Sequence, residues 1–179
     1  MSRKRSLRKP QLIVRRLSPA RPVGWLEFGS YRWPCAFGRA GISPNKKEGD
    51  GVTPRGVYVL RRVLYRADKI QRPMTGLAIQ RTAPDMGWCD AVGDRNYNRK
   101  IRHPYPVSAE QLWRDDELYD LVVVLSHNER PRIQGRGSAV FMHVARPGFR
   151  PTEGCIALRK SDLRKLLKRA GRQAKIRIT

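Results

Sequence analysis

Short apolar stretches separated by turn residues follow one another along the chain. Residues 11–17, 24–28 and 31–37 are three such stretches, and their spacing is typical of a β-meander. Residues 56–65 alternate apolar and polar side chains as a half-buried strand does, and residues 77–81 are a further strand candidate. The run Leu-Val-Val-Val-Leu at 121–125 is too short for a buried helix and predicts a central strand.

Helical signals occur in two places. Residues 108–111 fit a capping box with Ser108 at the N-cap and Gln111 at N3, and Leu112, Trp113 and Leu118 follow at an approximate helical spacing, which predicts a short helix. Residues 161–172 predict an amphipathic helix that begins after Ser161 as N-cap and ends at Gly171. Its apolar face holds Leu163, Leu166, Leu167 and Ala170. A short strand is expected at 175–179.

At least eight strand candidates against these two helices predict a mainly β fold, and periodicity alone goes no further than that. The 179 residues suffice for one domain with its own core. Residues 1–10 carry five cations and almost no apolar side chains, so we expect a disordered basic arm there and a single domain over 11–179.

The stretch 138–159 combines two residues that can perform acyl transfer. Residues 138–144 have the pattern of a strand containing His143, residues 146–154 are rich in Pro and Gly, and Cys155 precedes an apolar segment at 156–158. A loop of this length brings its ends together at little entropic cost, so the histidine can meet the cysteine. A thiolate is a nucleophile and an imidazole is a base that can generate it.

The surroundings of Cys155 in the sequence fit the same chemistry. Arg146, Arg150 and Arg159 are expected to lower the thiol pKa by their positive charge. Gly154 permits a sharp turn that would point the N–H groups of Gly154 and Cys155 at an oxyanion. The alternative is that Cys155 is a buried core thiol and His143 a structural strand residue, because both residue types are often buried without any reactive role.

The amino-acid sequences of several segments resemble those of one family. His143 followed by Thr-Glu-Gly-Cys-Ile-Ala-Leu at 152–158 resembles the catalytic signature of the L,D-transpeptidase (YkuD-type) family. Lys-Glu-Gly-Asp-Gly-Val-Thr-Pro-Arg-Gly-Val-Tyr at 47–58 resembles a second segment of the family. Three further segments resemble one compact branch: Trp-Cys-Asp at 88–90, Arg-Asn-Tyr-Asn-Arg at 95–99 and Gly-Arg-Gly-Ser-Ala-Val-Phe-Met-His at 135–143. The resemblance covers roughly residues 10–179 and implies a β-sandwich with the cysteine loop above one sheet.

The resemblance also implies a reaction. Cys155 would attack the amide joining a diamino acid to D-alanine in a peptidoglycan stem, with His143 as base and Gly154 at the oxyanion. Transfer to an amine of another stem gives a cross-link, and transfer to water gives a carboxypeptidase. No cofactor or metal is implied. Glu153 stands where many members have a second histidine, and Ala157 stands where they have an arginine.

Candidate substrate-binding residues are Arg159, Thr152, His127 and Trp88. Arg159 is the arginine nearest in sequence to the position that Ala157 occupies. His127 follows the strand at 121–125 and lies either in the same pocket or in an exposed turn. Trp88 lies in a turn-rich segment, where binding residues are common, and its alternative is core packing. Asp90 and Asn98 nearby either line a polar pocket or cap turns.

Charge points to an anionic partner. The chain has 38 Lys and Arg against 15 Asp and Glu, a formal charge of +23. Nucleic acid, anionic lipid and an acidic wall polymer all carry the complementary charge. The rival hypothesis is therefore a basic nucleic-acid-binding protein without catalysis, carried by the arm and by the nine cations between 159 and 177. An aromatic content of 8% and the lack of a base-reading motif count against it.

The cysteines and the apolar runs indicate the cellular compartment in which the protein is expected. Cys35, Cys89 and Cys155 lack metal-ligand spacing, which argues against a zinc site. Cys35 and Cys89 could pair in an exported protein, and two buried thiols are the favoured interpretation. No conventional export signal is visible and no apolar run approaches the ~20 residues of a membrane span, so we expect a soluble domain. The family resemblance places it in the periplasm or envelope of a bacterium.

Overall fold

The computed structural model describes residues 11–18 and 21–179, so the basic arm predicted at 1–10 lies outside the described residues. The first half of the chain forms β1 (Leu12–Ser18), β2 (Arg21–Phe28), β3 (Tyr31–Ala36), β4 (Ile42–Ser43), β5 (Thr53–Pro54), β6 (Gly56–Tyr65), β7 (Ala78–Arg81) and β8 (Met86–Cys89). The second half forms β9 (Lys100–Arg102), β10 (Ala109–Gln111), β11 (Leu121–Leu125), β12 (Phe141–Val144), the 3-10 helix η1 (Pro147–Phe149), β13 (Ile156–Leu158), α1 (Lys160–Arg169) and β14 (Lys175–Ile178). The mainly β prediction is confirmed.

Nine strands form one sheet in the order β11-β12-β13-β3-β2-β1-β14-β6-β7. Because β11 also pairs with β6, the hydrogen-bonded order closes on itself. The predicted meander is the antiparallel β1-β2-β3 part of this sheet. The β12–β13 pair is parallel, and the loop holding η1 connects these two strands.

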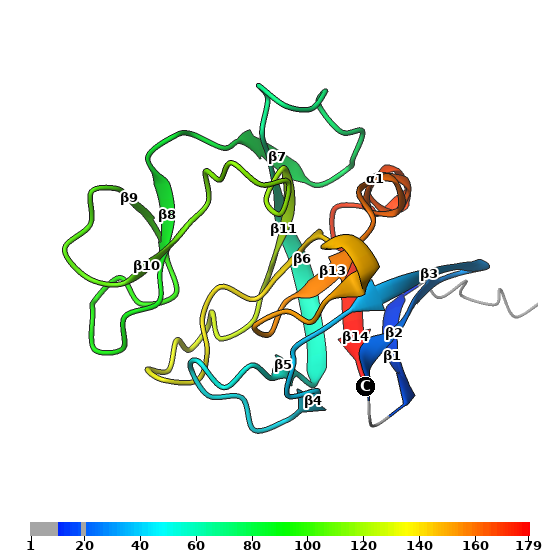
Figure 1. The fold of residues 1–179 in the computed structure, drawn as a ribbon, viewed down its shortest axis with the longest axis horizontal. Coiled ribbons are helices and arrows are strands. Elements are labelled where there is room, and N and C mark those ends of the chain that lie inside the picture. The colour runs from blue at the N-terminus through cyan, green and yellow to red at the C-terminus, as the bar shows by residue number, and fades with distance from the viewer. Residues whose placement is uncertain (1–10, 19–20) are drawn as a thin grey trace, which may run out of the picture.

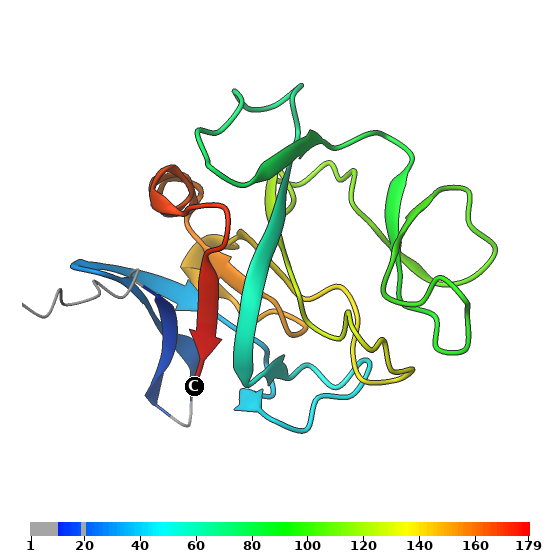
Figure 2. The ribbon, with the colours of Figure 1, turned by 180° about the vertical axis from the view of Figure 1, so that it is seen from behind.

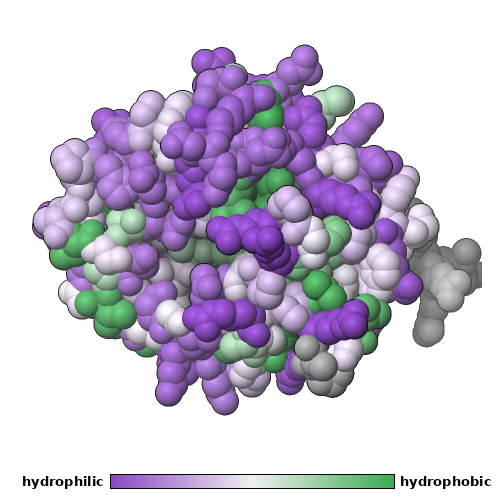
Figure 3. All heavy atoms as spheres, viewed as in Figure 1, coloured by the Kyte–Doolittle hydropathy of each residue, from purple (hydrophilic) through white to green (hydrophobic). Residues whose placement is uncertain are grey.

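Two smaller sheets accompany the main one. The β10-β8-β9 sheet stands to one side of the main sheet, and the short β4-β5 pair lies near one end of β6 (Figures 1 and 2). The face drawn in Figure 3 is hydrophilic over most of its area, with apolar side chains visible in a hollow near its centre.

Side-chain alternation along the central strands separates two apolar clusters. On β11, Leu121, Val123 and Leu125 enter the main core, whereas Val122 and Val124 face a second cluster beside β8 and β10. This arrangement follows from the two-residue period of a strand, and it explains why the run at 121–125 is apolar throughout. Each fully buried large aliphatic side chain contributes roughly 1.5–3 kcal/mol.

The helix predicted at 108–111 is wrong. Residues 109–111 form β10, which pairs antiparallel with β8 so that Glu110 lies opposite Trp88. Leu112 and Leu118, which suggested a helical spacing, pack in the second cluster without forming a helix, and Leu112 follows directly after the strand. The pairing of β10 with β8 therefore outweighs the local preference for a helix, because a short isolated helix has little stability of its own.

The C-terminal helix exists, but it begins two residues earlier than it would with Ser161 as N-cap. α1 starts at Lys160 with Arg159 as N-cap, and Arg159 makes no side-chain capping bond. Leu163, Leu166 and Leu167 pack into the main core as the amphipathic pattern predicted. Within the part of the chain that the structure describes, no helix is both long and apolar enough to cross a membrane.

Candidate active site

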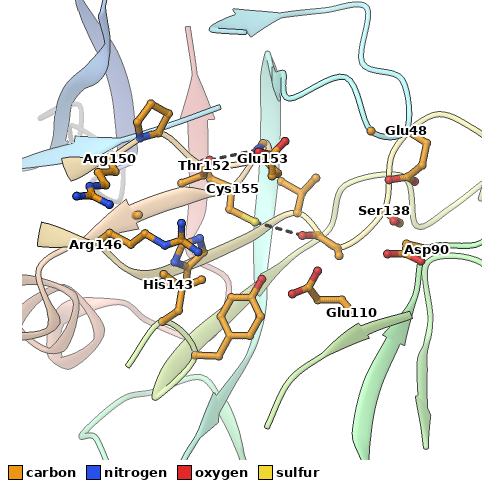
Figure 4. Close-up of a pocket in the computed structure, with 18 of the residues that line it drawn as sticks. Glu48, Asp90, Glu110, Ser138, His143, Arg146, Arg150, Thr152, Glu153 and Cys155 are labelled. Carbon is orange, nitrogen blue, oxygen red and sulfur yellow. Dashed lines mark hydrogen bonds between the residues drawn. The ribbon is translucent and has the colours of Figure 1, made fainter. Parts of the chain in front are cut away.

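Strand alternation brings His143 and Cys155 to one face of the main sheet. On β12, Met142 and Val144 enter the main core, which leaves His143 on the opposite face. In the parallel β12–β13 register, His143 lies opposite Ala157, and Cys155 is two positions before Ala157 on the same side. Both residues line the same pocket (Figure 4). The two ends of the loop therefore open into one pocket, and direct contact between the thiol and the imidazole stays a prediction.

The sulfur of Cys155 is held by backbone groups. Its thiol donates to the carbonyl of Ala139 at 3.3 Å and accepts the N–H of Phe141 at 3.4 Å. Burial raises the pKa of the thiol to about 12, and Glu110 adds to the rise, whereas the Phe141 N–H and Lys46 oppose it. The lowered thiol pKa that the sequence led us to expect is wrong, because burial is the largest influence on it.

His143 is oriented as a neutral base. Its ring is buried, and Nδ1 lies 2.9 Å from the carbonyl of Val144. A carbonyl can only accept, so Nδ1 carries the hydrogen and Nε2 keeps a free lone pair. The ring of Tyr119 packs edge-on against it at 5.4 Å between centroids. Burial lowers the pKa of His143 to about 4, so the imidazole is uncharged at neutral pH.

The turn before Cys155 is braced by two threonines. Thr152 donates its hydroxyl to the Cys155 carbonyl at 2.7 Å and accepts the N–H of Gly154 at 3.1 Å. Thr53 donates to the Gly154 carbonyl at 2.9 Å and accepts the N–H of Gly38 at 2.8 Å. The Gly-Asp-Gly-Val-Thr-Pro segment thus has a physical connection to the cysteine turn.

Glycine is required at position 154 because the backbone of Val52 approaches it closely. The predicted role of its N–H group as an oxyanion donor needs correction. Its φ is +133°, and a Cβ there would lie 2.7 Å from the Val52 carbonyl oxygen. Its N–H already donates to Thr152, so it is engaged within the turn and does not face a free oxyanion site. The N–H of Cys155 is left as the predicted oxyanion donor.

Asp50 organises the neighbouring turn and places a buried cation at the site. Its carboxylate accepts the N–H groups of Lys47 at 2.7 Å and Val52 at 2.9 Å, and it pairs with Lys46 Nζ at 2.5 Å. Lys46 is 5% exposed and reaches towards the turn, since Nζ would lie 3.3 Å from a Cβ on Gly154. A positive charge therefore lies beside the cysteine turn.

The pocket has a volume of about 410 Å³, which suits a peptide-sized ligand. Charged residues of both signs line it: Lys46, Arg114, Arg146 and Arg150 against Glu48, Asp90, Glu110 and Glu153. In the view of Figure 4, Arg146 and Arg150 lie on one side of Cys155, and Glu48 and Asp90 lie on the other.

A comparison with protein-family models matches residues 25–178 to the YkuD family, the L,D-transpeptidase catalytic domain. This chain belongs to that family. The match spans nearly the whole chain, and the family acts on peptidoglycan peptides and is typical of the bacterial cell envelope.

Comparisons with individual proteins add little to the family assignment. Curated proteins give no match to this L,D-transpeptidase domain. Among solved structures, Bd1075 of Bdellovibrio bacteriovorus is 13% identical over 96% of this chain and 48% of its own, with a TM-score of 0.49. The domain spans about half the length of that protein.

The structure places three of the predicted substrate-binding residues of this L,D-transpeptidase domain away from the pocket lining. Arg159 lies at the N-cap of α1, with its guanidinium 5.4 Å from the centre of the Phe149 ring. His127 Nε2 lies 2.9 Å from the Arg136 carbonyl, and its ring packs against Tyr58. Thr152 does line the pocket, although its hydroxyl is used within the cysteine turn.

Trp88, the third of these residues, supports the nucleophile indirectly. Its ring packs edge-on against Phe141 at 5.3 Å, and its Nε1–H donates to Asn98 at 2.9 Å. The same Asn98 oxygen accepts the N–H of Ala139 at 3.2 Å, and Ala139 in turn accepts the thiol of Cys155. The packing alternative is thus the observed arrangement for Trp88, and Asn98 ties loops together as a turn residue does.

Several other predictions about the site can now be compared with the structure. Cys35 and Cys89 are buried free thiols, as the favoured interpretation had it. Glu153, in the place of a second histidine, is exposed and pairs with Arg39 at 2.9 Å. Sequence reasoning missed Tyr119 and Glu110 as pocket residues. Glu110 could have been found only if its strand had been recognised.

Proposed function

We propose that this protein is a cysteine acyltransferase acting on peptidoglycan stem peptides, and that Cys155 is its nucleophile and His143 its base. The observation that carries the proposal is that His143 on β12 and Cys155, directly before the adjacent parallel strand β13, line one pocket. The Nε2 of His143, which is free because Nδ1 faces the Val144 carbonyl, fits the role of a general base.

In the first half-reaction, Cys155 attacks the amide carbonyl that joins the L-centre of a diamino acid to a terminal D-alanine. The thiol proton moves to Nε2 of His143 as the sulfur–carbon bond forms. When the tetrahedral intermediate collapses, the carbon–nitrogen bond breaks and His143 returns the proton to the departing amine. D-alanine leaves, and a thioester links the remaining stem to Cys155.

In the second half-reaction, an amine of another stem or a water molecule attacks the thioester. His143 removes the proton from the attacking group, and the sulfur departs and is protonated as a thiol. Attack by an amine makes a cross-link, and attack by water makes the protein an L,D-carboxypeptidase. Both outcomes use the same acyl-enzyme.

Charge stabilisation in this scheme comes from groups around the cysteine turn. The N–H of Cys155 would donate to the oxyanion, and the ammonium of Lys46 lies beside the same turn, next to Gly154. Arg146 and Arg150, which line the pocket, would bind the carboxylate of the terminal D-alanine. In this proposal they have the substrate-binding role for which the sequence made Arg159 a candidate.

The proposal is tested by incubating the protein with a defined tetrapeptide stem that ends in D-alanine and measuring free D-alanine. We expect release by the wild type and none by Cys155→Ala. Adding a second stem with a free side-chain amine distinguishes the two activities, because a cross-linked product identifies a transpeptidase and a tripeptide identifies a carboxypeptidase. Equal D-alanine release by both proteins would overturn the assignment.

A further inference from the structure

The charge of the pocket differs from the charge of the molecule. Lys and Arg outnumber Asp and Glu by 38 to 15 in the chain, yet the pocket is lined by four residues of each sign. Four of the fifteen acidic residues therefore gather around one pocket. Figure 4 shows Glu48 and Asp90 on the side of Cys155 that lies away from Arg146 and Arg150. We call the side with Glu48, Asp90 and Glu110 the acidic end, although Arg114 lies 3.8 Å from Glu110 and Lys46 packs beside Gly137 there.

Two buried oxygen atoms at the acidic end lack a partner. Ser138 is 8% exposed and lines the pocket, and its hydroxyl has no hydrogen-bond partner among the described residues. Asp90 Oδ1 is also buried without a described partner. Figure 4 places Ser138 between Glu48 and Asp90 in that view. Buried polar atoms are nearly always hydrogen-bonded, so an orphan hydroxyl and an orphan carboxylate oxygen together call for a donor from a ligand.

Glu110 continues the acidic end towards the nucleophile. It shares a hydrogen bond with the buried Tyr119, whose ring packs against His143. Its charge also influences the thiol of Cys155. The acidic end therefore begins beside the reacting sulfur and continues to Asp90 and Ser138.

We propose that Asp90, Ser138, Glu110 and Glu48 form a subsite for the primary ammonium of a diamino side chain. This inference rests on the proposed function and names what selects its substrate. An ammonium has three donors and no acceptor, so it can satisfy the orphan oxygens of Asp90 and Ser138 together. A neutral side chain would leave both unsatisfied. Because Arg146 and Arg150 bind a carboxylate at the other end, the pocket selects a peptide that carries both charges.

The ammonium has two sources in the reaction. In the donor stem, the diamino residue supplies the attacked carbonyl, and its side chain would place an ammonium in the subsite during acylation. In the second half-reaction, the ammonium of the acceptor stem would occupy the subsite, release one proton to water, and then attack as the neutral amine. The experiment below has one arm for each source.

The donor arm measures binding without turnover. Two tetrapeptide stems differ only in the residue before the terminal D-alanine, which is lysine in one and norleucine in the other. Calorimetry on Cys155→Ala should show about tenfold tighter binding of the lysine peptide, the effect of one charge-assisted hydrogen bond. Adding Asp90→Asn should remove most of this difference, and Ser138→Ala should reduce it. Adding Glu129→Gln, an acid-to-amide change at a residue paired with Arg61, should leave it unchanged.

The acceptor arm measures transfer from the acyl-enzyme formed by the norleucine donor on otherwise wild-type Cys155. Transfer to a lysine-containing acceptor should fall in Asp90→Asn relative to transfer to water if the acceptor amine uses the subsite. A dependence on Asp90 in either arm supports the subsite and identifies the source. If both arms show no dependence on the amine charge or on Asp90, the subsite is overturned.

The two arms also separate this inference from the proposed function. Charge-dependent binding by Cys155→Ala without D-alanine release by the wild type would support the subsite and overturn the acyltransferase. D-alanine release without charge discrimination in either arm would support the acyltransferase and overturn the subsite.

Discussion

Burial disfavours the charged forms of both Cys155 and His143, so it shifts their pKa values in opposite directions. It raises the pKa of the thiol to about 12 and lowers the pKa of the imidazole to about 4, so both groups are neutral in the resting protein. A preformed thiolate–imidazolium pair is therefore absent at neutral pH. Proton transfer must accompany attack on the substrate.

This state predicts an alkylation profile. Iodoacetamide should modify Cys155 slowly at pH 7, and the rate should keep rising with pH well beyond the ordinary thiol range near 8.5. His143→Gln should abolish D-alanine release yet leave this profile nearly unchanged, because the histidine acts only once substrate is bound. Intact-mass measurement of the modified fraction over time gives the rates. A wild-type rate that levels off near neutral pH would contradict the account.

The buried imidazole also makes stability depend on pH. The unfolded state binds a proton near the ordinary pKa of 6.5, whereas the folded state does so only near 4, so the unfolded state carries more protons between these values. The free energy of unfolding should therefore fall by about 3 kcal/mol as the pH drops from 6.5 to 4. Urea unfolding at several pH values measures this slope.

Two matched variants show which histidine causes the dependence of the unfolding free energy on pH. His143→Gln should flatten it, and His127→Gln should flatten it to a smaller extent, because burial lowers the pKa of His127 as well. If the slope of His143→Gln equals that of the wild type, His143 does not titrate as the structure indicates.

At the scale of elements, the cysteine turn depends on the Thr53 strand segment. Replacing Thr53 by Val removes the bonds to the Gly154 carbonyl and the Gly38 N–H in a fully buried position, which should cost about 1–3 kcal/mol of stability. D-alanine release should fall further than stability alone explains, and Thr53→Ser should restore much of both. Chemical denaturation and turnover of the three proteins provide the check.

The glycine before the cysteine gives a second test of this turn. Gly154→Ala would introduce a Cβ against the Val52 carbonyl at a φ that side chains rarely adopt, so we expect a loss of roughly 1–3 kcal/mol and of activity. Gly171→Ala is the control, because a Cβ there meets nothing within 4 Å. Wild-type stability and turnover in Gly154→Ala would show that the turn tolerates a side chain.

How far the sequence predicts these elements depends on the range of the interactions that form them. The meander, the central strand and the Cys155–His143 pair follow from alternation and one loop, so local patterns suffice. Residues 109–111 become a strand only by pairing with β8, a contact that the local capping signal does not contain. Glu110 lies in that pairing and lines the pocket, and so it escaped prediction. The desolvation that sets the pKa of Cys155 likewise depends on packing from distant segments.

At the scale of the whole molecule, net charge and pocket charge have different consequences. The formal charge of +23 should attract any anionic polymer, and binding to peptidoglycan sacculi should weaken severalfold as salt rises from 50 to 300 mM, since the Debye length is about 10 Å at 0.1 M. Duplex DNA should bind at low salt without sequence preference, because charge reads phosphates and not bases. Co-sedimentation and gel-shift titrations measure both. Salt-resistant binding to sacculi, or discrimination of one DNA sequence, would contradict this view of the surface.

The central claim is that Cys155 forms a thioester with a peptidoglycan stem. Intact-mass spectrometry after rapid mixing with a tetrapeptide stem that ends in D-alanine tests it most directly. The account predicts an added mass equal to the stem minus D-alanine, located on Cys155, and no such adduct on Cys155→Ala. An adduct that persists in Cys155→Ala, or D-alanine release by the wild type through an enzyme that is never acylated at Cys155, would contradict it.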